Sequence, residues 1–134
     1  METIESPLID IKANTASVFA FLSDCTKHKL LMPDGIENFT ADADTCSFTI
    51  KGTGNLALKV EEKVPNSLIK LLPTGKVPFS FEFLWVVEPD GENSKVQNKI
   101  IAKMNPFIKA LAYKPLKNFI SEQALNLQKY YNNQ

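Results

Sequence analysis

The chain has 134 residues, a length that fits one domain and allows a substantial core without disulfides or metals. Its 15 basic residues, all of them Lys, balance 15 acidic residues, so no electrostatic footprint for nucleic acid or an anionic membrane is visible. The lack of Arg removes the bidentate group that usually anchors phosphate, which argues against a heavily phosphorylated ligand.

The sequence shows no sign of a targeting segment or a membrane span. The N-terminus, Met1–Glu5, has neither a basic stretch nor an apolar stretch of the secretory kind. Lysines interrupt the most apolar helix well short of the roughly 18 apolar residues that a membrane span needs. Two cysteines, Cys25 and Cys46, are too few for a disulfide scaffold. We therefore expect one domain over residues 1–134, located in the cytoplasm, with no integral membrane segment.

The N-terminal part predicts a strand followed by two short helices. Residues 3–12 carry Ile4, Leu8, Ile9 and Ile11, and Pro7 favours a sheet edge because proline cannot donate a ladder hydrogen bond. The strand ends at Ala13-Asn14-Thr15, a polar cluster that can stop a strand and cap a helix. Residues 16–22 have helical spacing, and Ser23-Asp24 can cap a second helix that runs to Met32.

From Ile36 onward the hydrophobic period changes to two, which predicts strands with one dry and one wet face. The dry positions are Cys46, Phe48, Ile50, Leu56, Leu58 and Val60. Turn residues separate the strands at Gly52-Thr53-Gly54, Pro65-Asn66-Ser67, Pro73-Thr74-Gly75-Lys76 and Pro89-Asp90-Gly91-Glu92-Asn93. The middle of the chain therefore predicts an antiparallel meander of about six strands.

One strand of this meander carries an unusual number of rings on one face. Phe79, Phe81, Phe83 and Trp85 alternate along it, followed by Val87. Such a face either fills a core or lines a cavity, and both need the same residue types.

A long helix is predicted from Asn105-Pro106 to about Tyr131, with Asn as the cap and Pro at the first helical position. Its apolar residues share one face, which must lie on the sheet: Ile108, Leu111, Ala112, Leu116, Phe119, Ile120, Leu127 and Tyr130. Pro115 is expected to kink this helix and so let it follow a concave sheet.

This order of elements resembles the helix-grip fold of the SRPBCC superfamily, which includes START domains, the birch-pollen allergen family and bacterial polyketide cyclases. The segments that carry the resemblance are Ile9–Lys12, Thr15–Asp24, Leu31-Met32-Pro33, Ser47–Gly52, Gly75–Phe81, Asn105-Pro106 and Lys114-Pro115-Leu116. They look especially like a short uncharacterised group common in Bacteroidetes. The resemblance implies an α+β fold in which a curved antiparallel sheet of six or seven strands wraps around the long C-terminal helix.

The family resemblance further implies a hydrophobic cavity between sheet and helix, which different members use for lipids, hormones, polyketides or quinones. The predicted ligand-binding residues are Phe48, Leu58, Phe79, Phe81, Phe83, Trp85, Asn98, Ile100, Leu111 and Phe119. Asn98 is the polar member, and its amide needs a partner from the protein or from a ligand.

Polar residues offer weaker candidates for chemistry. Cys25 and His28 stand one helical turn apart, but a metal would need more ligands and a nucleophile pair would need an orienting residue. We therefore predict no metal and no other cofactor. The carboxylate pairs are expected in a turn and at the sheet rim: Asp42 with Asp44, and Glu61 with Glu62. Hydroxyls at the cavity mouth are the possible role of Tyr113, Tyr130 and Tyr131.

Three functions compete at this point. The sequence favours non-enzymatic binding of a small hydrophobic or amphipathic ligand by a monomer or homodimer, with no nucleic acid as partner. The first alternative is a cyclase or hydrolase acting on a hydrophobic substrate in the same cavity. The second is a co-chaperone-like interaction module that uses the outer face of the sheet at Leu84, Val86 and Ile101.

Overall fold

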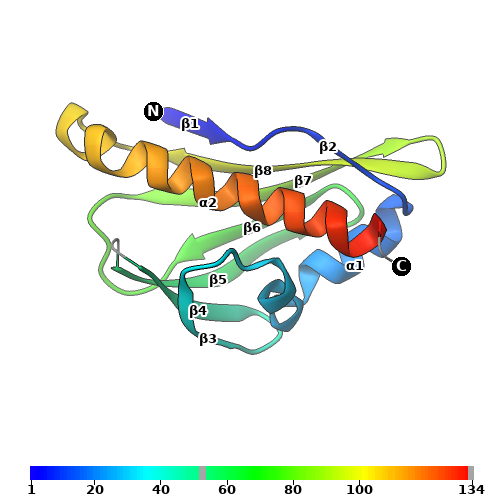
Figure 1. Ribbon diagram of the computed structural model, residues 1–134, viewed down its shortest axis with the longest axis horizontal. Helices are drawn as coiled ribbons and strands as arrows, with labels where there is room; N and C mark the ends of the chain where they lie inside the picture. Colours follow the sequence, from blue (N-terminus) through cyan, green and yellow to red (C-terminus); the bar gives the residue numbers. More distant parts are fainter. Residues whose placement is uncertain (52–53, 133–134) are drawn as a thin grey trace.

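A curved antiparallel sheet with one long helix across it forms most of the molecule in the computed structural model (Figure 1). The structure describes residues 1–51 and 54–132, so two residues of the turn predicted at positions 52–54 lie outside the described part. The elements in chain order are β1 (Glu2–Glu5), β2 (Ile9–Ile11), α1 (Thr15–Ser23), η1 (Cys25–Leu31), β3 (Ile36–Ala41), β4 (Thr45–Ile50), β5 (Gly54–Val64), β6 (Leu68–Pro73), β7 (Phe81–Asp90), β8 (Asn93–Ala102) and α2 (Pro106–Asn132).

The strands form one antiparallel sheet in the order β1-β8-β7-β6-β5-β4-β3, with β2 also paired to β8. It has eight strands, one more than the upper expectation, because the first predicted strand divides into two at Ser6-Pro7-Leu8. Pro7 lacks the N–H that a continuous ladder needs, and both short strands pair with the edge of β8. The prediction of an edge position for this segment is therefore confirmed.

The two short helices begin at the predicted polar caps. The Asn14 side chain accepts a hydrogen bond from the Ser17 amide at 2.8 Å, which fixes the start of α1. The Asp24 side chain accepts one from the Thr26 amide at 3.0 Å, at the start of η1. The second helix is a 3₁₀ helix, and it ends at Leu31, directly before Met32 and Pro33.

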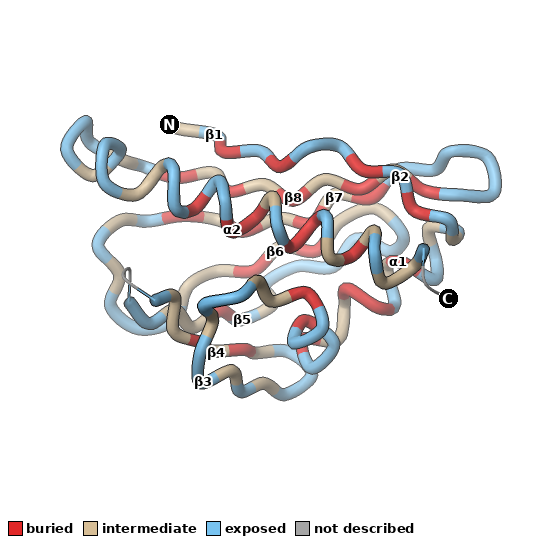
Figure 2. Tube along the Cα trace, viewed as in Figure 1, coloured by how far each residue is buried: buried red, intermediate tan, exposed pale blue. Residues whose placement is uncertain are grey.

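Burial follows the period-two pattern along the sheet, as the red positions in Figure 2 show. On β7 the alternate residues from Phe81 to Val87 are all buried, and their neighbours are half-buried. On α2 the pattern changes along the helix. None of residues 106–115 is fully buried, whereas Leu116 begins a series of buried positions that ends at Leu127. The sheet and the second half of α2 therefore enclose the packed core.

Among the described residues, no helix is long and apolar enough to cross a bilayer.

Candidate functional site

A cavity of about 460 Å³ lies between the sheet and the first half of α2. Phe81 and Phe83 on β7 and Ile100 on β8 form its floor. The part of the wall that comes from α2 consists of Ile108, Leu111, Ala112, Pro115, Leu116 and Phe119. The facing ends of β4 and β5 add Ile50, Gly54, Asn55 and Leu56. The segment before β7 adds Lys76, Val77, Pro78 and Phe79. The wall is mostly apolar, and it suits an apolar or amphipathic molecule.

The position of the cavity follows from which elements cover the sheet. We call the half of the sheet–helix space that holds the cavity the open end, and the half beneath residues 120–132 of α2 the closed end. At the closed end α1 packs on β6 and β7, while η1 contacts α2. Phe21 of α1 packs against Tyr130, and Asn126 donates a hydrogen bond to the Leu31 carbonyl at 2.9 Å. These contacts fill the space between sheet and helix at the closed end, whereas the corresponding space at the open end stays empty.

Of the ten residues predicted to bind a ligand, six line the cavity: Phe79, Phe81, Phe83, Ile100, Leu111 and Phe119. Phe79 lies before the first residue of β7 instead of inside that strand, and its ring contacts Phe81 with centroids 5.6 Å apart. It reaches the wall from the loop that follows β6.

The prediction places four other residues at the cavity, but the structure places them outside its wall: Phe48, Leu58, Trp85 and Asn98. All four are buried. Phe48 stacks behind Phe119, with ring centroids 5.4 Å apart, while Trp85 and Asn98 belong to the closed end. The alternation of a strand shows which face a side chain occupies, but it does not show where along the face a cavity ends.

Sequence reasoning missed the contribution of Lys76, Val77 and Pro78, because this loop has no hydrophobic period. Turn residues were the available signal, and they predicted only a connection between strands. The helical spacing predicts the correct face for Ile108 and Ala112, and the structure adds that both line the cavity.

Asn98 is fully buried, and its Nδ2 donates a hydrogen bond to Oε1 of Gln123 on α2 at 3.0 Å. Its backbone also binds Ser6, because the Asn98 amide donates to Ser6 Oγ at 2.9 Å. Directly opposite on β7 lies Trp85, which is also fully buried. Among the described residues, no group hydrogen-bonds Oδ1 of Asn98 or Nε1 of Trp85.

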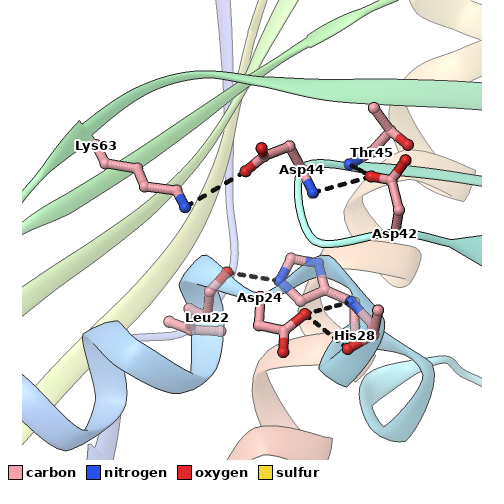
Figure 3. Close-up of polar contacts among 8 residues, drawn as sticks. Leu22, Asp24, His28, Asp42, Asp44, Thr45 and Lys63 are labelled. Atoms are coloured by element: carbon pink, nitrogen blue, oxygen red, sulfur yellow. Dashed lines mark hydrogen bonds and ion pairs between the residues drawn. The ribbon is translucent and has the colours of Figure 1, made fainter.

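His28 and Cys25 have separate structural surroundings, and Figure 3 shows those of His28. Nε2 of His28 donates a hydrogen bond to the Leu22 carbonyl at 2.8 Å, near the C-terminal end of α1. Burial lowers the pKa of His28, so its ring is neutral at pH 7. The hydrogen bond shared with Cys25, together with burial, raises the pKa of the Cys46 thiol. Within the described residues, no three His, Cys, Asp or Glu side chains gather as metal ligands.

The paired carboxylates lie where turns and the sheet rim were predicted. Oδ1 of Asp42 accepts hydrogen bonds from the amides of Asp44 and Thr45 in the β3–β4 turn (Figure 3). These hydrogen bonds lower the pKa of the Asp42 carboxyl. Glu62 follows an irregularity in the β5–β6 register, and it is exposed. The carboxylates therefore stabilise turns and edges, away from the cavity.

The tyrosines do not line the cavity. The expected position of Tyr130 and Tyr131 at its mouth is wrong, because both rings pack on Phe21 at the closed end. Tyr113 is half-buried on α2, with the Lys109 ammonium 5.9 Å from its ring centroid.

The outer face of the sheet is charged and only partly apolar. Leu84, Val86 and Ile101 are half-buried there. Ion pairs cross this face beside them, from Lys70 to Glu82 at 3.6 Å and from Lys99 to Glu5 at 3.3 Å. These three residues do not form the exposed apolar patch that an interaction module requires.

No protein-family model matches this chain, and a search of curated protein sequences finds no significant match. Solved structures do match. A START superfamily protein from Mycobacterium smegmatis has a TM-score of 0.69 at 15% identity, over 98% of this chain and 97% of that one. The Aha1 dimer from Colwellia psychrerythraea has a TM-score of 0.69 at 18% identity, over 98% and 96%.

The di-domain ARO/CYC protein BexL from the BE-7585A biosynthetic pathway has a TM-score of 0.73 at 14% identity, over 99% of this chain and 47% of that one. At these identities the matches establish the fold, while the similarity to a Bacteroidetes group stays a prediction. The sheet, the long C-terminal helix and these neighbours together show that the chain has the helix-grip fold of SRPBCC-type, START-like proteins.

Proposed function

We propose that the protein binds one small hydrophobic or amphipathic molecule, of the lipid, quinone or polyketide type, without transforming it chemically. The observation that carries this proposal is the apolar cavity of about 460 Å³ beneath the start of α2, where none of residues 106–115 is fully buried. An apolar helix face gains stability when it is covered, and a ligand can supply that cover.

The energetics are sufficient for binding without catalysis. Removing roughly 200 Å² of apolar ligand surface from water stabilises a complex by about 5 kcal/mol at 25 cal/mol per Å², before ordering costs. The polar side chains that line the described cavity wall are those of Asn55 and Lys76, and both residues are exposed. Neither offers the buried acid or base that a cyclase or hydrolase would need, which favours binding over catalysis.

The location that we expect is the cytoplasm. Cys25 and Cys46 are both free thiols and both buried. Free thiols are typical of a reducing compartment, so the proposed ligand is an intracellular molecule.

The test compares two alanines of α2. Ala112 lines the cavity, whereas Ala110 is exposed on the same helix, so a phenylalanine at each position changes the helix by the same amount. We expect Ala112→Phe to weaken binding of the fluorescent probe 1-anilinonaphthalene-8-sulfonate at least tenfold and Ala110→Phe to leave it unchanged. Equal binding by the two variants contradicts the proposed site. If the two variants differ as expected, native mass spectrometry of protein purified gently from its own host would identify the natural ligand.

A further inference from the structure

Three pairs of facing residues on β7 and β8 follow one another along the inner face of the sheet. In the ladder, Phe81 lies opposite Ala102, Phe83 opposite Ile100, and Trp85 opposite Asn98. Side chains two positions apart point to the same face, and successive pairs are about 6 to 7 Å apart. Phe81, Phe83 and Ile100 line the cavity, so the Trp85–Asn98 pair comes directly after its inner end.

This pair holds one free donor and one free acceptor. Trp85 and Asn98 are both 0% exposed, and no described residue hydrogen-bonds Nε1 of Trp85 or Oδ1 of Asn98. The 3.0 Å hydrogen bond from Nδ2 to Gln123 fixes the orientation of the Asn98 amide. Trp85 and Asn98 are direct cross-strand partners, and in such pairs the Cβ atoms are about 4.5 to 5.5 Å apart, so both polar side chains start from the same small region beside the inner end of the cavity. Buried polar atoms in folded proteins are normally satisfied.

We propose that the Trp85–Asn98 pair is the polar end of the ligand site and receives a hydroxyl group of an amphipathic ligand. The hydroxyl oxygen accepts a hydrogen bond from Nε1–H of Trp85, and the hydroxyl hydrogen is donated to Oδ1 of Asn98. The apolar part of the ligand then occupies the space between Phe83, Ile100 and α2. This inference rests on the proposed binding function, and it narrows the ligand to a hydrophobic molecule with a terminal alcohol or phenol.

Other polar groups fit this pair less well. A ketone or ether oxygen accepts from Trp85 but leaves Oδ1 of Asn98 without a donor. A carboxylate places negative charge beside the same carbonyl oxygen, in a fully buried position where an unpaired charge is costly. The ligand reaches the pair past Phe83 and Phe119, the last rings of the cavity wall, through rotation of these side chains.

The experiment uses the fact that Trp85 is the single tryptophan of the chain. A ¹H–¹⁵N correlation spectrum of the whole protein therefore contains one indole N–H signal. The probes are 1-naphthol and 1-methylnaphthalene, which have nearly the same size and differ by a hydroxyl against a methyl group. We expect 1-naphthol to bind at least tenfold more tightly and to move the indole proton downfield. We expect 1-methylnaphthalene to bind without that downfield shift.

Variants test the same preference independently. The double variant Asn98→Leu with Gln123→Met replaces both partners of the 3.0 Å hydrogen bond by apolar groups, and it should bind the two probes equally. The control is Ser94→Ala, because Ser94 is another buried polar residue on the same face of β8 and binds the Ala13 carbonyl at 2.7 Å. This control should keep the preference for 1-naphthol.

The outcomes separate the inference from the proposed function. Equal binding of both probes to the native protein, with an unmoved indole signal, overturns the polar end but leaves the binding cavity in place. A preference for 1-naphthol that survives in the double variant also overturns the polar end. If neither probe binds the native protein, both the inference and the proposed function fail. Because the decisive titration uses the native protein, a variant that does not fold leaves this test intact.

Discussion

The open and closed ends of the space between sheet and α2 are built from the same kinds of residue, yet they pack differently. At the closed end, Ala124 and Leu127 are 0% exposed. At the open end, Leu111 on the same helix lines the cavity and is 63% exposed. The α1 and η1 segments contact the sheet and α2 at the closed end, and α2 alone spans the open end.

This difference shows that hydrophobicity alone does not decide between a core and a cavity. A curved sheet and one helix leave more volume than their own side chains fill, and a second covering element is needed to reach native packing density. Where α1 and η1 supply that cover, the protein gains stability. Where they do not, the same residue types become available to a ligand.

The largest expected effect comes from two leucines of α2. Leu127→Ala should lower the free energy of unfolding by about 2 to 5 kcal/mol, because it removes a fully buried side chain. Leu111→Ala should lower it by only about 0.5 kcal/mol or less, since Leu111 is mostly exposed. Urea unfolding followed by circular dichroism measures both. Equal losses would show that the two ends are packed alike.

The second prediction concerns pH and His28. Burial lowers the pKa of folded His28 below its ordinary value of 6.5, so the unfolded chain binds an extra proton below that pH. Stability is therefore complete above pH 6.5 and falls as the pH decreases, by up to about 1.4 kcal/mol per pH unit. Urea unfolding at pH 7.5 and 5.0 should show this loss in the native protein and a smaller loss in His28→Gln.

The pH range keeps this test specific. Hydrogen bonds lower the carboxyl pKa values of Asp24 and Asp42 from 3.8. The contribution of these two carboxylates to the stability of the fold is therefore lost only in more acidic solution than this test uses. An unchanged pH dependence in His28→Gln would show that another titrating group controls it.

The third prediction is that the open end accepts extra volume. Ala112→Phe should raise the free energy of unfolding by about 0.5 to 2 kcal/mol if its ring fills cavity space. The exposed control Ala110→Phe should have little effect. Thermal unfolding of both variants checks this, and a lower stability of Ala112→Phe would show that the cavity is too closely packed to accept a ring.

The smallest expected effect tests how α2 is held at the closed end. Asn126→Ala removes the 2.9 Å hydrogen bond to the Leu31 carbonyl and should cost about 0.5 to 1.5 kcal/mol. Hydrogen exchange should show faster opening of η1 in this variant, while the amides of β7 keep their protection. Unchanged exchange in η1 would mean that side-chain packing, rather than this hydrogen bond, holds the two elements together.

The sequence by itself determined the elements and the faces that they bury. The alternation from Phe81 to Val87 and the caps at Asn14 and Asp24 are local signals, and the structure confirms each of them. Local sequence also indicated the helix start at Pro106. The family resemblance added how these elements are arranged in space, with a curved sheet around the long helix, and the solved structures support that arrangement.

Only the tertiary structure decided where the cavity lies. Trp85 and Phe83 have the same pattern in sequence, but His28 of η1 packs beside Trp85, with ring centroids 6.4 Å apart. Tyr131 reaches the Ser17 carbonyl of α1 from 114 positions away in sequence. Such contacts depend on the path of the whole chain, so period and propensity cannot show which of two similar aromatic residues meets a neighbour and which borders a cavity.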